Sequence, residues 1–122
     1  MPTPDRLALG QLGEDLACRE LRRRGYAILA RRYRTRVGEL DIIARDGETV
    51  VFVEVKARAT VRCGAPAEAV TPAKRRKLAM MAADYLVRKR LIDVPCRFDV
   101  VAVDIGARPI ITVFQGAFTL DS

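Results

Sequence analysis

The stretch Gly38–Lys56, GELDIIARDGETVVFVEVK, contains the clearest structural signal in the chain. Its middle holds Asp46-Gly47, and this dipeptide is a strong signal for a two-residue hairpin turn because both residue types tolerate positive φ angles. The segments on either side are rich in β-branched residues, which favour strands. The stretch therefore predicts two antiparallel strands over about 38–45 and 49–56, joined by a tight turn.

Upstream of this hairpin, the chain predicts one helix and one strand. Leucines recur at helical spacing between Asp5 and Arg24, and Gly25 follows where a helix end favours glycine. A strand follows over Tyr26–Tyr33. Glycine weakens a helix interior by about 1 kcal/mol relative to alanine, so Gly10 and Gly13 indicate that the helix backbone approaches another element closely.

Downstream, a long connection leads to a second helix and two further strands. The connection carries Gly64 and Pro66 and has little periodicity, whereas Thr71-Pro72 combines a helix N-cap with a proline at the first helical position. The expected elements are a connection over 57–70, a helix from Thr71-Pro72 to about Leu91, and strands over 97–105 and 109–114. The predicted order is αβββαββ in a single α/β domain that spans residues 1–122.

The charge balance favours a polyanionic partner. The 122 residues include 22 Lys+Arg against 15 Asp+Glu, a net charge of +7, and 18 of the 22 basic residues are arginine. Arginine suits bidentate phosphate contacts, so nucleic acid is the leading candidate, although a coding bias toward arginine is an equal alternative. The chain has no histidine, which excludes mechanisms that need an imidazole.

The three cysteines and the hydropathy pattern indicate where the protein works. Cys18, Cys63 and Cys96 are odd in number and widely spaced, which matches neither a disulfide framework nor a zinc site. No apolar run approaches the roughly 18 residues of a membrane span, and the N-terminus does not resemble a secretory signal. We therefore expect a soluble, cytoplasmic protein without a membrane partner.

Acidic residues interrupt both strands of the hairpin. Glu39 and Asp41 alternate on the first strand, and Glu54 and Lys56 alternate on the second, so the sequence predicts that they converge on one face. Charges in such an apolar strand are costly unless something offsets them. The alternative is an ordinary exposed alternation in which Asp41 pairs with Lys56.

A divalent cation, Mg²⁺ or Mn²⁺, would offset that cost, because Mg²⁺ takes oxygen ligands. Asp41 and Glu54 are the predicted metal ligands. Lys56 lies two residues after Glu54, where it can orient the attacking water or neutralise charge on a phosphate. Glu14 is the predicted third ligand, because a helix packed on the sheet through its glycines would aim this carboxylate at the cluster.

An Asp followed by Glu-x-Lys on the next strand, behind a helix that bears a Glu, resembles the PD-(D/E)xK nuclease superfamily. Four stretches together resemble the YraN-like family of bacterial proteins, which is similar to archaeal Holliday-junction resolvases. These stretches are Gly13-Glu14, Gly38–Asp41, Phe52–Lys56 and Arg97–Val101. The resemblance implies a restriction-endonuclease-like fold with a central mixed sheet flanked by helices. It also implies metal ligation by Asp41 and Glu54, a nearby carboxylate from Glu14 and a catalytic lysine at Lys56. Glu39, Arg58 and Asp99 belong to the family motifs without an assigned role.

Three functions are compatible with the sequence. The first is a metal-dependent endonuclease that hydrolyses DNA phosphodiesters at branched or damaged structures. The second is a nucleic-acid-binding or assembly module without catalysis, and the third is a small domain with a protein partner.

The predicted nucleic-acid contacts are Arg58, Arg62, Lys74, Arg75 and Lys77. Cations at a helix start oppose its dipole, which favours either a bound phosphate or a solvated face. A homodimer is left open, because enzymes that cut symmetric junctions are often two-fold dimers.

Overall fold

The computed structural model describes residues 6–59 and 71–118 as five strands and two helices. These elements are α1 (Arg6–Arg23), β1 (Ala27–Arg34), β2 (Glu39–Asp46), β3 (Thr49–Arg58), α2 (Pro72–Arg88), β4 (Cys96–Asp104) and β5 (Ile110–Phe118). The predicted α/β class and the order αβββαββ are confirmed. Helix α2 ends three residues before Leu91, because the backbone turns into the left-handed region at Arg90, with φ 55°. Strand β5 runs four residues beyond its predicted end.

The five strands form one mixed sheet in the order β1-β2-β3-β4-β5. Neighbouring strands are antiparallel except β3 and β4, which are parallel because α2 lies in the crossover between them. The hairpin turn lies one residue later than predicted. Asp46 pairs with Thr49, so the turn residues are Gly47, with φ 61°, and Glu48.

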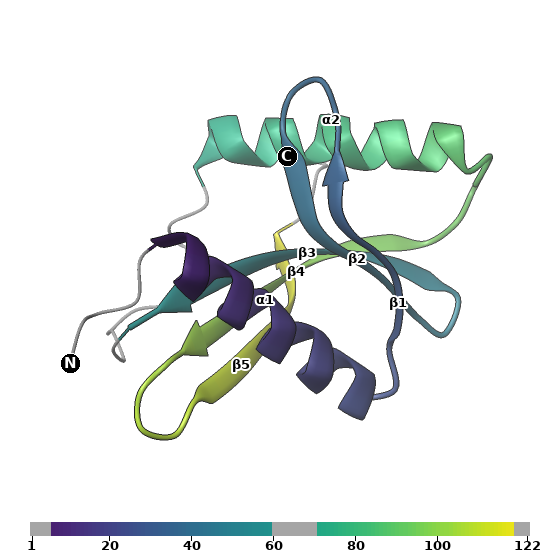
Figure 1. Ribbon diagram of the computed structural model, residues 1–122. Helices are drawn as coiled ribbons and strands as arrows, with labels where there is room; N and C mark the ends of the chain where they lie inside the picture. The colour runs from purple at the N-terminus through teal and green to yellow at the C-terminus, as the bar shows by residue number, and fades with distance from the viewer. Residues whose placement is uncertain (1–5, 60–70, 119–122) are drawn as a thin grey trace.

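The two helices cover opposite faces of the sheet (Figure 1). One core cluster lies on the α2 side and includes Leu40, Phe52 and Tyr85. A second cluster lies on the α1 side and includes Leu21, Ile42 and Val53. Strand β3 supplies buried residues to both clusters, so it is the central strand of the core.

Neither helix of the described ranges 6–59 and 71–118 is long and apolar enough to cross a membrane. Cys18 is buried, Cys96 is exposed, and both are free thiols. Cys63 lies outside the described residues.

A buried charge network holds the end of the sheet where β4 begins. Asp99 has no solvent exposure, and its Oδ1 accepts hydrogen bonds from Arg97 Nε and from the Gly116 amide, both at 3.0 Å. The hydroxyl of Tyr26 lies 3.4 Å from Asp99 Oδ2 and accepts from Gln115 Nε2 at 2.7 Å. Burial and the Asp99 charge raise the pKa of Tyr26. Asp99, a motif residue without an assigned role, therefore ties β4 to β5 and to the residue before β1.

We expect Asp99→Ala to lower the free energy of unfolding by about 3–5 kcal/mol, because it leaves Arg97 without its buried partner. Urea denaturation followed by circular dichroism measures this change. Asp15→Ala is the control, because Asp15 forms an exposed ion pair whose loss costs about 1 kcal/mol or less. Equal losses in the two variants would contradict a structural role for Asp99.

Candidate functional site

Helix α1 packs closely on β3 at Gly13. A Cβ atom on Gly13 would lie 2.5 Å from the Cβ of Ala57, which is closer than real Cβ contacts. The close approach predicted for Gly13 is thus confirmed. The same prediction for Gly10 is wrong, since a Cβ there would meet nothing within 4 Å. The contact at Gly13 sets how deeply the next residue, Glu14, lies against the sheet.

Glu14 is 7% exposed and is held by two arginines of β1. Arg31 Nε donates to Glu14 Oε1 at 3.0 Å, and Arg32 Nε lies 3.2 Å from both carboxylate oxygens. Two consecutive residues of a regular strand point to opposite faces. Both arginines reach Glu14 because the strand is irregular here, with Arg32 at φ 52°.

Strand β2 has a matching irregularity at Asp41. Leu40 packs in the α2-side cluster, whereas Ile42 packs in the α1-side cluster. Residues two apart on a regular strand share a face, so the alternation changes at Asp41. The pairing of β1 with β2 keeps one register across this point, from Arg31–Ile42 to Tyr33–Leu40, and its register shift lies earlier, between Ile28 and Ala30.

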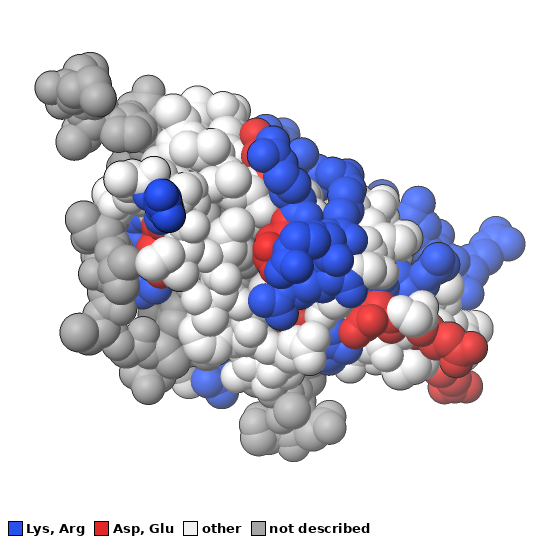
Figure 2. Space-filling model, turned by 90° about the horizontal axis from the view of Figure 1, so that it is seen from below, with Lys and Arg blue, Asp and Glu red and all other residues white. Residues whose placement is uncertain are grey.

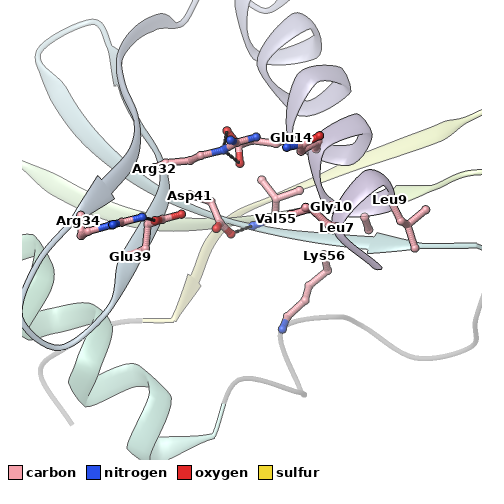
Figure 3. A pocket seen from close by; sticks show the side chains of 12 residues that line it. Leu7, Leu9, Gly10, Glu14, Arg32, Arg34, Glu39, Asp41, Val55 and Lys56 are labelled. Carbon is pink, nitrogen blue, oxygen red and sulfur yellow. Dashed lines mark hydrogen bonds and ion pairs between the residues drawn. The ribbon is translucent and has the colours of Figure 1, made fainter. Parts of the chain in front are cut away.

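The predicted convergence of Glu39, Asp41, Glu54 and Lys56 on one face stays a prediction, and the directions of Glu54 and Lys56 follow from their neighbours on β3. Val53 and Val55 pack in the α1-side cluster, so the alternating Glu54 and Lys56 point to the α2 side of β3. Figure 3 shows Lys56 directed away from Glu14. The negative charge of Asp41 acts on both Lys56 and Lys74, so Asp41 lies near this group.

Asp41 lies where β2 and β3 part. The last pair between these strands is Ile42–Val53, and beyond it the Val55 amide donates to Asp41 Oδ2 at 2.8 Å. Burial, and then the negative charge of Glu54, raise the pKa of Asp41 to about 7. Asp41 and Glu54 therefore lie near enough to repel each other.

Two lysines neutralise Glu54 on the α2 side. Lys74 Nζ, from the first turn of α2, donates to Glu54 Oε1, and Lys56 Nζ lies 3.7 Å from the same oxygen. Burial and the Lys74 ammonium lower the pKa of Lys56. Burial acts to lower the pKa of Lys74 as well, but the contact with Glu54 outweighs it and the pKa is raised.

A cleft of about 610 Å³ opens beside Asp41, between the N-terminal half of α1 and the β1–β2 hairpin (Figure 3). Glu14 lies on the helix side, Arg32 and Arg34 lie on the hairpin side, and Asp41 and Val55 lie between them. The Arg34 side chain is 85% exposed and lies 3.5 Å from Glu39. The cleft thus brings basic side chains next to a buried carboxylate.

The predicted nucleic-acid contacts are spread over different environments. Arg58 forms a bidentate ion pair with Asp104, at 2.7 and 3.0 Å, and is 16% exposed. Lys74 contacts Glu54, Arg75 is half-buried, and Lys77 is exposed. Arg62 lies outside the described residues. Their role in nucleic-acid binding stays a prediction.

Sequence reasoning missed Arg34 as a lining residue of the cleft. The available signal was its alternation with Arg32, two residues earlier on the same strand. The face opposite α2 carries a cluster of Lys and Arg side chains bordered by acidic ones (Figure 2). Positive charge is therefore not limited to the start of α2.

The donor set at the cleft fits a hard divalent cation in part. Asp41 lines the cleft, and Glu54 is near enough to repel it although it is not among the lining residues. Both supply the carboxylate oxygens that Mg²⁺ prefers, and a cation would relieve their repulsion. Glu14 is occupied by its two arginines. Among residues 6–59 and 71–118, no three or more His, Cys, Asp or Glu side chains are placed together to hold a metal ion.

A mixed sheet with Asp41 on one strand, Glu54-x-Lys56 on the next and a Glu-bearing helix behind them defines a PD-(D/E)xK-like protein. The chain belongs to one family of that class, whose model is described as "Uncharacterised protein family UPF0102" and matches residues 13–103. The resemblance to the YraN-like family is thereby confirmed.

Relatives support this assignment along the whole chain. A UPF0102 protein of Ralstonia pickettii is 48% identical over 126 residues, which covers 99% of this chain and 98% of that protein. A UPF0102 protein of Geotalea uraniireducens is 50% identical over 99 residues, 81% of this chain and 78% of its own length. Another from Geobacter sulfurreducens is 53% identical over 97 residues, 80% of this chain and 76% of that protein.

We expect Gly13→Ala to destabilise the protein by about 1–3 kcal/mol, because the added methyl group forces α1 away from Ala57. The free energy of unfolding in urea measures this loss. Gly10→Ala is the matched control on the same helix. It has open space around the new Cβ and removes a helical glycine, so it is neutral or stabilising by up to about 1 kcal/mol. The same loss in both variants would show that α1 does not depend on this contact.

Proposed function

We propose that this protein is a divalent-metal-dependent endonuclease that hydrolyses DNA phosphodiesters at branched or damaged structures. The observation that carries the proposal is the half-buried carboxylate of Asp41, which lies beside an open cleft. Its pKa is raised by partial burial and by the charge of Glu54. Repelling acidic groups in a cleft are typical of functional sites, since such repulsion is unfavourable for folding alone.

Asp41 and Glu54 are the residues that would hold Mg²⁺ or Mn²⁺. Such an ion supplies an activated water and neutralises negative charge on the phosphate. Lys56 contributes a fixed positive charge beside Glu54, within 3.7 Å. Because burial and Lys74 lower its pKa, Lys56 is also easier to deprotonate than an ordinary lysine. Glu14 acts as the anchor of Arg31 and Arg32, and it would have to leave them to become a third ligand.

The DNA backbone would lie along the cleft, with its phosphates on the hairpin side. Arg32 and Arg34 present guanidinium groups there, and Asp41 lies between them and α1. A net charge of +7 favours association with a polyanion of this kind. We propose branched DNA as the substrate, and a homodimer as the assembly, because of the likeness to resolvases. The cytoplasm is the proposed location, in keeping with free thiols at Cys18 and Cys96.

A second candidate, a nucleic-acid-binding module without catalysis, is supported by the ion pairs of the acidic residues. Glu14 is bound by Arg31 and Arg32, and Glu54 is bound by Lys74. A protein in which these pairs are permanent would bind DNA through its basic surface and never load a metal. The first candidate therefore predicts metal-dependent cutting that requires Asp41, whereas the second predicts DNA binding without cutting.

We expect purified protein to cut labelled four-way or flap DNA with Mg²⁺ or Mn²⁺ and not with chelator. Asp41→Asn should reduce cutting by about a hundredfold or more, because it removes a metal ligand. DNA affinity should persist, and so should folding, because asparagine can still accept from the Val55 amide. Asp15→Asn, which changes an exposed acid on α1, is the control and should cut normally.

Equal cutting by wild type and Asp41→Asn would contradict the assignment and point to a contaminating nuclease. Binding of all substrates without any metal-dependent product would favour the second candidate. Duplex and single-stranded DNA in the same assay rank the substrate preference.

We expect Arg34→Ala to weaken DNA binding and to reduce the slope of log affinity against log salt by about 1, as for the loss of one phosphate contact. Fluorescence anisotropy in chelator measures this without cleavage. Arg23→Ala is the matched control, because Arg23 is exposed and ion-paired, with Glu20, but lies at the far end of α1. If both variants keep the wild-type slope, the backbone does not follow the cleft.

A further inference from the structure

Glu54 is shared by two lysines that come from different elements. Lys56 follows it on β3, whereas Lys74 reaches it from α2. The start of α2 is fixed by Thr71, whose hydroxyl accepts from the Lys74 amide at 3.2 Å. Lys74 therefore approaches Glu54 from a helix start that is capped and held in place.

The two lysines share one carboxylate at ion-pair distance, and the negative charge of Asp41 also acts on both of them. The three side chains are only partly exposed, at 10% for Glu54, 32% for Lys56 and 37% for Lys74. A divalent cation bound to Glu54 would lie next to both lysines and would compete with Lys74 for the same oxygen, Oε1. Like charges this close repel strongly where water is partly excluded.

Lys74 can leave Glu54 if another anion accepts it. Its side chain is exposed enough to move, and Lys77 lies one turn further along the same helix with its side chain in solvent. A phosphate at the start of α2 would offer Lys74 a new partner, and the helix dipole favours an anion there.

We propose that Lys74 is a resident counter-ion of Glu54 that obstructs cation binding until a nucleic-acid phosphate draws the lysine away. This inference rests on the proposed function and adds a positioning residue that couples metal loading to DNA binding. The protein without DNA then binds metal weakly, and binding of the phosphate backbone releases Glu54 for the cation. By thermodynamic linkage, the bound cation strengthens DNA binding by the same factor by which bound DNA strengthens cation binding.

The first test is a Mn²⁺ titration of the DNA-free protein, with free Mn²⁺ followed by electron paramagnetic resonance. Lys74→Gln should bind Mn²⁺ about tenfold more tightly than wild type, because it removes the competing charge. Lys74→Arg keeps the charge and should bind as weakly as wild type. Lys89→Gln, at the far end of the same helix, is the matched control and should not change the affinity.

Equal Mn²⁺ affinity in wild type and Lys74→Gln would overturn the inference and leave the proposed function intact. If neither wild type nor Lys74→Gln binds Mn²⁺, the proposed function itself fails. Thermal unfolding of each variant in chelator shows whether the substitution leaves the fold unchanged.

The second test repeats the titration with a duplex whose phosphorothioate linkages resist hydrolysis. The duplex should raise the Mn²⁺ affinity of wild type by about tenfold and that of Lys74→Gln by much less, since the obstruction is already absent. An equal gain in both proteins would mean that DNA and metal are coupled through other groups, and would overturn the role of Lys74.

Discussion

Beyond the Ile42–Val53 pair, β2 and β3 no longer pair, and the Val55 amide donates to the Asp41 carboxylate. This side-chain hydrogen bond satisfies a backbone amide that the sheet ladder leaves unpaired, which a buried strand requires. It also holds the Asp41 carboxylate beside the cleft and within reach of the negative charge of Glu54.

Two acidic residues of the sheet have different surroundings. Asp99 is completely buried, and its carboxylate accepts hydrogen bonds from Arg97 and from the Gly116 amide. Asp41 is half-buried, has one amide donor and is repelled by the charge of Glu54. A protein under selection only for stability would gain by replacing Asp41 with a neutral residue. The contrast separates a structural carboxylate from one whose charge serves another purpose.

The order of elements, the β2–β3 hairpin and the close approach of Gly13 were predictable, because each depends on local sequence. The irregularity of the strands at Arg32 and Asp41 was not predictable from the sequence. No glycine or proline marks it, and it arises from pairing between strands and from Glu14 attracting both Arg31 and Arg32. Contacts between the parallel strands β3 and β4 were equally unpredictable from the sequence. Arg58 lies beside Asp104 because β3 and β4 run parallel, and sequence separation gives no hint of that register.

The basic start of α2 shows how tertiary contacts change the meaning of a local pattern. Cations at a helix N-terminus oppose the dipole, and the sequence alone offers a phosphate or solvent as the remedy. Lys74 instead finds a carboxylate on the central strand, while Lys77 remains in solvent. The unfavourable placement of Lys74 on its helix is thus offset by Glu54 and, to a smaller extent, by the negative charge of Asp41. A phosphate and a carboxylate compete for the same ammonium group, so the acidic site and the nucleic-acid surface meet at this one residue.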